Sequence, residues 1–448
     1  MRVCMSTGVS IGRKLWTAGK VGGETTRYLR IAALAILVAS LPAHAGGARL
    51  YETSAGDIAL ASAGYVARAQ DSSTVYSNPA GMCLLEPGND FLLSVQPLYG
   101  DVSFTPNDNT TAVGSDGGNA IALFPGASAF WAGGGERLKW GVGLVGNFGL
   151  GLDYEDEWVG RYYVQDTTLV GVTLAPSVAW RVNDKFSIGG SLHAMYGVFD
   201  FTTAVNNINP LLDDGSLKFD DTTWGYGGRV GVLIEPSESA RIGLVYQSKI
   251  ELDFKGTPEF AGLGALREAA LDAAGLLDAE LDLGMNVPQA VMASAYGDVG
   301  DWAVMGNIGW ENWEDFGKVS VSVTSDATTS LTQDRHYEDT WHVAVGAQRR
   351  LSNWTISFGT AYDSSVVEDQ DRTVDLPLGP ALRVGVGGTR AQRGRVPEMV
   401  FSYELVWSGD LAVDQFRGPV AGRVAGNYEQ VALHFLGASF RWGKQGGS

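Results

Sequence analysis

Residues 168–182, TLVGVTLAPSVAWRV, alternate between larger apolar side chains and small or polar ones. One face carries Val170, Val172, Leu174, Val178 and Trp180, and the other carries Thr173, Ala175, Ser177 and Arg181. A repeat of two residues is the pattern of a β-strand, and an apolar face with an aromatic residue near its end is typical of a strand that faces lipid. The two-residue turn Asn183-Asp184 follows, so the stretch predicts one arm of a β-hairpin. A strand of a soluble β-sandwich alternates in the same way.

The same unit repeats in both directions along residues 90–443. Fourteen strands are predicted, near 90–104, 120–132, 138–151, 168–182, 185–203, 220–236, 240–255, 284–297, 301–322, 338–350, 353–364, 380–390, 396–408 and 427–443. Six very short connections alternate with seven long polar ones, near 105–119, 152–167, 204–219, 256–283, 323–337, 365–379 and 409–426. Short turns at one end, long loops at the other and an even strand number are features of bacterial outer-membrane barrels. Because a bilayer core admits only helices and closed barrels, we predict an all-β fold, a 14-stranded antiparallel transmembrane β-barrel.

The first 45 residues have the pattern of a secretory signal peptide. Arg27 and Arg30 precede an apolar run at residues 31–41, and Ala43-His44-Ala45 then offers the small residues that a signal peptidase reads. The apolar run is too short to cross about 30 Å of hydrocarbon as a helix. We therefore expect cleavage before Gly46 and export of the remaining chain.

Charge and cysteine content narrow the function classes. The whole chain has a formal net charge of −18, and without the basic leader the balance falls to −23. Nucleic acid is excluded as a partner, because phosphate binding requires a cationic surface. Cys83 is alone once the leader is removed, so no intramolecular disulfide is expected. No later stretch is long and apolar enough for a membrane helix.

The segment before the first strand is rich in small residues and has no room for a core of its own. About 40 residues seldom fold alone without disulfides or metals, so we expect this segment to lie inside the barrel as a hatch. The predicted order is a signal peptide at 1–45, the hatch at 46–89, the barrel at 90–443 and a tail at 444–448.

Residues 71–81, DSSTVYSNPAG, resemble the signature of the FadL family of outer-membrane transporters of long-chain fatty acids and hydrocarbons. Further similarity extends over the full mature length and keeps its order. It is carried by residues 147–150 (NFGL), 158–162 (WVGRY), 176–184 (PSVAWRVND), 339–341 (DTW), 345–346 (VG) and 361–363 (AYD).

The resemblance implies a 14-stranded barrel with an N-terminal hatch. It also implies that hydrophobic ligands are caught among extracellular loops, bind in a lumen site that includes the chain's N-terminus, and leave sideways through a kink in the third strand. The residues that it assigns to the lateral gate and ligand site are Asn147, Phe148, Gly149 and Leu150. Those assigned to the hatch turn are Asn78, Pro79, Ala80 and Gly81, and those at the lumen N-terminus are Gly46, Arg49 and Leu50.

Glycine supports a bend in the third strand independently of the resemblance. Five glycines between 141 and 151 make this strand soft, and glycine inside a strand often marks a bulge. Gly141-x-Gly143-x-x-Gly146 also fits a dinucleotide-binding pattern, but no helix follows and no acidic residue is correctly placed.

The loop at 256–283 contains an apolar set at helical spacing, which predicts a short amphipathic helix on the extracellular side. Its members are Leu266, Ala269, Ala270, Ala273 and Leu277, preceded by Phe260 and Leu263. Such a helix could cap the barrel mouth, or its apolar face could collect hydrophobic molecules from water. The sequence leaves both readings open.

Two features concern the cargo. The last strand is apolar in both phases, with Val431, Leu433 and Phe435 on one of them, whereas a water-filled porin keeps its inner phase polar. As the resemblance implies, fatty-acid members carry a basic lumen residue two positions after the Tyr of strand five, where this chain has Val198. A carboxylate in an apolar pocket needs a cation or several donors. A neutral hydrocarbon or aromatic cargo is therefore favoured, unless Arg229 or Arg383 substitutes.

No catalytic or metal-binding constellation is recognisable. The four histidines after the leader are scattered without HExxH spacing, and no Gly-x-Ser-x-Gly motif occurs. Acidic runs at 153–157 and 368–371 are expected to be solvated surface, with Ca²⁺ binding as the alternative. We therefore expect that the protein is not an enzyme and that it uses no cofactor or metal. We expect a monomer that takes up hydrophobic small molecules passively. Its expected surroundings are outer-membrane lipid and lipopolysaccharide. The alternatives are a general polar-solute porin and, less favoured, a barrel enzyme or adhesin.

Overall fold

The structure is a computed structural model that describes residues 49–443 except 122, 210, 326 and 327. The predicted signal peptide, Gly46 and the tail lie outside the described residues.

Three short helices come first, α2 Ala55–Ile58, α3 Thr74–Ser77 and η1 Pro79–Leu84. The elements that follow are β1 Gly88–Val95, β2 Leu98–Asp101, β3 Phe104–Pro106, β4 Ala127–Gly134, β5 Leu138–Asp153, β6 Asp166–Asn183, β7 Phe186–Val205, β8 Gly215–Ser237, β9 Ala240–Gln247, β10 Ile250–Gly256, β11 Glu259–Ala261, α4 Ala265–Ala274, β12 Glu280–Val287, β13 Ala290–Val299, β14 Trp302–Glu311, α5 Trp313–Phe316, β15 Lys318–Thr324, β16 Thr328–Asp334, β17 Thr340–Arg350, β18 Trp354–Asp363, β19 Ala381–Arg390, β20 Glu398–Phe416, α6 Gly418–Ala421 and β21 Arg423–Gly443.

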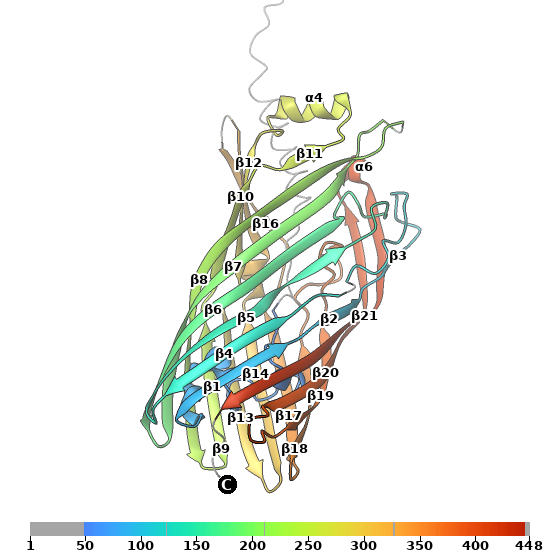
Figure 1. Ribbon diagram of the computed structural model, residues 1–448. Helices are drawn as coiled ribbons and strands as arrows, with labels where there is room; N and C mark the ends of the chain where they lie inside the picture. The colour runs from blue at the N-terminus through green and yellow to red at the C-terminus, as the bar shows by residue number, and fades with distance from the viewer. Residues whose placement is uncertain (1–48, 122, 210, 326–327, 444–448) are drawn as a thin grey trace, which may run out of the picture.

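These strands form a closed barrel. Each neighbouring pair is antiparallel, and β1 pairs with both β4 and the last strand β21, which closes the ring. The prediction of a 14-stranded antiparallel barrel is confirmed. Figure 1 shows tight turns at one end and the longer loops, with α4, at the other. Alternation puts Trp180, Trp224 and Trp341 on the outer face, each about half exposed, as expected for side chains in contact with lipid.

Four predicted strands are interrupted, which corrects the sequence analysis. The one at 90–104 is β1, β2 and the first residue of β3. The one at 240–255 is β9 and β10, the one at 284–297 spans part of β12 and then β13, and the one at 301–322 is β14, α5 and β15. Pro288 has no backbone N–H to continue the ladder between β12 and β13. The upper segments β10, β12, β15 and β16 form a separate four-stranded sheet.

Several predicted loops are also wrong in extent, because alternation continues beyond the membrane. The region at 409–426 is mostly strand, since β20 runs to Phe416 and β21 starts at Arg423. Leu411, Val413 and Val424 from this region are buried. They belong to a large apolar cluster that fills the extracellular end of the lumen, together with Phe148, Trp158, Phe199, Phe219, Phe254 and Trp313. Among the described residues, no helix has the length and apolarity of a membrane span.

The N-terminal segment lies inside the barrel, as Figure 1 shows for its blue helices, and glycines on the inner wall let its backbone approach. A Cβ added at Gly359 would lie 1.8 Å from the carbonyl oxygen of Leu60, and one at Gly243 would lie 1.9 Å from that of Val66. The wall also accepts hydrogen bonds from the segment, for example from Gly64 N to Asn307 Oδ1 at 2.7 Å. Glycine in these strands therefore serves close packing of hatch against wall.

Candidate functional site

The third barrel strand, β5, contains a bulge at the position where the sequence predicts a bend. Its pairing with β6 is regular up to Gly146 opposite Val172 and resumes with Phe148 opposite Gly171, so Asn147 is an extra residue. Asn147 and Phe148 are consecutive and both buried, which a regular alternating strand does not allow. The side chain of Asn147 accepts a hydrogen bond from Thr173 Oγ1 at 2.9 Å.

Gly149 fixes the chain just above this bulge. Its φ is +128°, in the region that favours glycine. A Cβ at this position would lie 2.1 Å from the carbonyl oxygen of Leu169 and 2.7 Å from the Cα of Val170. Both conformation and space therefore require glycine here. The backbone of Leu150 continues the ladder opposite Leu169.

The N-terminal segment contacts the bulge directly. In the described chain the β4–β5 ladder ends at Ser128 opposite Val145. Above it, the backbone of Arg49 bridges to Phe148, and Leu50 N donates to the carbonyl of Asn147 at 3.0 Å. The ring of Phe148 lies among those of Trp313 and Phe316 from α5, with centroids 6.5 and 6.0 Å away. The start of the described chain and the irregular part of the wall thus form one unit.

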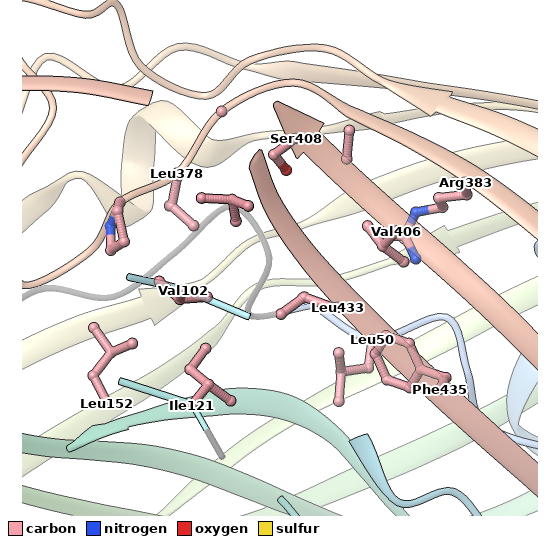
Figure 2. Close-up of a pocket in the computed structure, with 14 residues that line it drawn as sticks. Leu50, Val102, Ile121, Leu152, Leu378, Arg383, Val406, Ser408, Leu433 and Phe435 are labelled. Atoms are coloured by element: carbon pink, nitrogen blue, oxygen red, sulfur yellow. The ribbon is translucent and has the colours of Figure 1, made fainter. Parts of the chain in front are cut away.

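A cavity lies beside this unit in the lumen (Figure 2). Most of the residues around it are apolar: Leu50, Val102, Ile121, Leu152, Pro377, Leu378, Gly379, Ala381, Val406, Val431, Leu433 and Phe435. Among the described residues that line it, the polar side chains are Arg383 and Ser408. The inner phase of β21 thus faces this cavity, which accounts for its apolar character. The cavity has a volume of about 50 Å³, so a long ligand requires neighbouring side chains to move.

Arg383 is held by acidic groups of this chain. Its Nε donates to Asp363 Oδ2 at 2.5 Å, and its Nη1 pairs with Glu52 and lies 3.6 Å from Glu404 Oε1. Asp363 also bonds His342 Nδ1 at 2.6 Å. Glu52 comes from the hatch segment and the others from the wall, so this ion cluster ties hatch to barrel.

Arg229 also binds the hatch. Its guanidinium donates to the carbonyls of Tyr76 and Ser77 and to Gln247, and it lies 4.2 Å from the centroid of the Tyr76 ring. The hatch turn next to it is held by Asn78, whose Nδ2 donates to the carbonyls of Val66 and Val232.

Pro79 starts η1, and Asn78 Oδ1 accepts from the amide of Ala80 at 3.2 Å. A Cβ at Gly81 would lie 2.2 Å from Thr74 Oγ1. The contacts of these four residues are therefore with the hatch and the wall.

The expectation about Val198 is wrong. Val198 follows Gly197 and precedes Phe199, and the buried inward residues of β7 next to this position are Met195, Gly197 and Phe199. Val198 therefore shares the outer face with Tyr196. The position cannot hold a lumen cation, because neighbouring residues of a strand point to opposite faces.

The extracellular helix α4 exists, but it ends earlier than predicted. Gly275 has a φ of +67° and terminates the helix after Ala274, so Leu277 lies outside it. Leu266 is 71% exposed, while Phe260 packs against the apolar cluster of the lumen and Leu263 is partly buried. The neighbouring loop adds exposed Ile208, Leu211 and Leu212.

Hydrogen bonds join the loops that carry these residues. Asn207 bonds the carbonyl of Gly262 and the amide of Gly264 at 2.9 and 2.8 Å. Asp214 pairs with Arg161 at 2.9 Å and accepts from the hydroxyl of Tyr162. Burial and then this hydrogen bond raise the pKa of Tyr162 to about 12, so it stays a donor at neutral pH. In the described residues no group of three or more His, Cys, Asp or Glu is placed to hold a metal ion.

Residues 36–441 match the family described as outer membrane protein transport protein (OMPP1/FadL/TodX). The chain belongs to this family. The expected resemblance to FadL is confirmed, and the protein is an outer-membrane β-barrel.

Several relatives of this OMPP1/FadL/TodX member match over most of their length. The long-chain fatty acid transport protein of Escherichia coli O6:H1 is 25% identical over 391 residues, covering 80% of this chain and 86% of that protein. Outer membrane protein P1 of Haemophilus influenzae (strain Rd) is 28% identical over 394 residues, covering 76% and 83%.

Solved structures show the same fold. A Pseudomonas aeruginosa FadL homologue superposes with a TM-score of 0.80 at 18% identity, covering 89% of this chain and all of that one. The Ralstonia pickettii toluene transporter TbuX gives 0.64 at 18% identity, with coverages of 88% and 99%.

Sequence reasoning on this family member missed the acidic partners of Arg383. Glu52, Asp363 and Glu404 are far apart in the chain and carry no common motif. Only the inward phase of β18 and β20 could have indicated that Asp363 and Glu404 belong to the lumen.

Proposed function

We propose that the protein takes hydrophobic compounds, long-chain fatty acids or hydrocarbons, passively across the outer membrane. Ligand is captured on the extracellular loops around α4, binds in the lumen cavity, and leaves sideways into the bilayer at the bulge of β5. The observation that carries this proposal is the apolar cavity bounded by Leu50 and the inner face of β21, adjacent to the bulge.

The energetics favour such a dry path. Exposing apolar surface to water costs about 25 cal/mol per Å², so a ligand that moves from an apolar cavity directly into hydrocarbon avoids this cost. Movement down a concentration gradient then needs no cofactor or energy source. Displacement of Leu50 from Asn147 by ligand would free the irregular edge of β5, which is the lateral gate in this proposal.

Capture is assigned to the exposed apolar side chains of the loops. Leu266 and Leu211 are 71% and 90% exposed, and exposed apolar side chains of this kind are suited to bind hydrophobic molecules from water. The described histidines, His193, His336, His342 and His434, are spread over different strands and loops, which supports a transporter without enzymatic activity. Outer-membrane lipid and lipopolysaccharide are the proposed surroundings, and a monomer the proposed state.

The test uses a strain from which the gene is deleted, and the same strain carrying the gene on a plasmid. Uptake of radiolabelled oleate, toluene and hexadecane is compared, with a small sugar as the polar control. The proposal predicts faster uptake of at least one hydrophobic compound and unchanged sugar uptake in the complemented strain. Equal uptake of all three in both strains would refute it, and ion conductance of the purified protein in planar bilayers would favour a polar-solute porin.

A further inference from the structure

We propose that the lumen cavity selects uncharged hydrophobic molecules and rejects carboxylates, with Glu404 and Glu52 as the residues that determine this specificity. This inference rests on the proposed function, because it concerns the cargo of the same cavity. It predicts that a hydrocarbon or a fatty ester is a ligand and that an ionised fatty acid is not.

The first observation is the charge at the polar end of the cavity. Arg383 is the cation among the lining residues, and Asp363, Glu52 and Glu404 surround its guanidinium. Figure 2 shows Arg383 beside Val406 at the edge of the apolar lining. One guanidinium faces three carboxyl groups, so these four groups together carry a positive charge only if all three carboxyl groups are protonated. Asp363 bonds both Arg383 and His342, which stabilises its ionised form.

The second observation is that the neighbouring cations have partners. Arg49 pairs with Glu311 at 3.1 Å and donates to Gln247 at 3.0 Å. Arg229 donates to two hatch carbonyls and to Gln247. Neither of these guanidinium groups is among the residues that line the cavity.

The third observation is the state of Glu404. Its residue exposure is 0% and neither carboxyl oxygen has a hydrogen-bond partner in the described structure. One oxygen of Glu52 is in the same state. Buried polar atoms without hydrogen bonds are rare and costly, and fixing the hatch to Arg383 requires only one carboxylate. Glu52 and Glu404 do not line the cavity themselves but surround Arg383, which does. The surplus of acid around this one lining cation is therefore attributed to selection against anions.

The physical consequence follows from desolvation. An ionised carboxylate that enters an apolar site without a free cation loses its hydration and gains no counter-charge. Here it would also lie near the Asp363 carboxylate, and the Arg383 guanidinium is already occupied by acidic groups of this chain. A neutral chain of the same length meets neither penalty, and the hydroxyl of Ser408 remains as a single donor or acceptor for a weakly polar group.

The experiment compares palmitate with methyl palmitate, which share the chain and differ in charge. Equilibrium binding of each radiolabelled compound is measured at pH 8 on the full protein in nanodiscs, with empty nanodiscs subtracted. The wild type is expected to bind the ester on the order of tenfold more tightly than the acid. Glu404→Gln is expected to raise the affinity for palmitate relative to the ester by several fold.

Glu52→Gln is the second variant and is expected to act in the same direction. Glu429→Gln, an exposed glutamate of β21, is the matched control and should change neither affinity. If the wild type binds palmitate as tightly as the ester or more tightly, the inference is overturned and the proposed function stays intact. This comparison uses the wild type alone, so it holds even if a variant does not assemble. An unchanged ratio in folded Glu404→Gln and Glu52→Gln also overturns it. Binding of neither compound above empty nanodiscs instead contradicts the proposed lumen site.

Discussion

Replacement of Gly149 by valine tests whether the bulge of β5 is the exit. Any Cβ at this position would lie 2.1 Å from the carbonyl oxygen of Leu169, and the φ of +128° is unfavourable for a β-branched residue. Strain of this kind costs about 1–3 kcal/mol, which disfavours the bulged conformation by roughly 5- to 150-fold. The strand is therefore expected to relax toward regular pairing with β6 and to obstruct the sideways path.

Gly146→Val is the matched control on the same strand. A Cβ at Gly146 would meet only the carbonyl oxygen of Ala127, at 3.8 Å, so this variant should keep the bulge. Initial uptake of the best hydrophobic substrate is measured for both variants, and folding is checked by the heat-dependent shift of the barrel on gels. We expect Gly149→Val to lose most uptake and Gly146→Val to keep it. Uptake at the wild-type rate by folded Gly149→Val would refute the lateral exit.

Three further predictions concern capture, binding and the hatch. Leu266→Asp should change the free energy of unfolding by no more than about 0.5 kcal/mol, because the side chain is exposed. It should nevertheless reduce the rate of uptake at limiting substrate and leave the rate at saturating substrate unchanged. A change in the rate at saturating substrate only would argue against capture at this residue. Leu433→Asp places a charge against the apolar cavity and should weaken equilibrium binding of methyl palmitate at least about tenfold; retained affinity would move the site elsewhere. Gly359→Val should prevent the hatch from packing inside the barrel, since the added Cβ would lie 1.8 Å from the carbonyl oxygen of Leu60. The variant should therefore either conduct ions in planar bilayers or fail to assemble. A folded variant that does not conduct would contradict this packing.

The barrel was predictable because its signal is local. Alternation along residues 168–182 and the rhythm of short and long connections both follow from strands that cross a bilayer and return. The interruptions were not predictable from this pattern. Segments at the extracellular end, such as β10 and β15, keep the two-residue alternation because they pack on the apolar cluster. The sequence therefore predicts one strand where the structure has two, β9 and β10 in one case and β14 and β15 in the other.

Other differences come from single positions. Helix α4 follows from the spacing of Leu266, Ala269 and Ala273, but its end depends on the left-handed conformation of Gly275. Val198 was assigned to the lumen although one step along a strand changes the face.

The Arg383 cluster depends on contacts between residues more than 300 positions apart, such as Glu52 and Arg383. No sequence spacing encodes such a contact. The apolar inner phase of β21 was visible in the sequence, but its cavity required the placement of Leu50 beside it.

Photolabelling tests the path of the cargo most directly. A long-chain hydrocarbon that carries a diazirine is supplied to cells that contain the protein, irradiated during uptake, and located on tryptic peptides by mass spectrometry. We expect labels on lumen-facing Leu433, which is partly buried, and on the segment around Phe148, which is buried in the resting structure. Labels restricted to outward residues such as Trp341, with none at these two positions, would contradict passage through the cavity and the bulge.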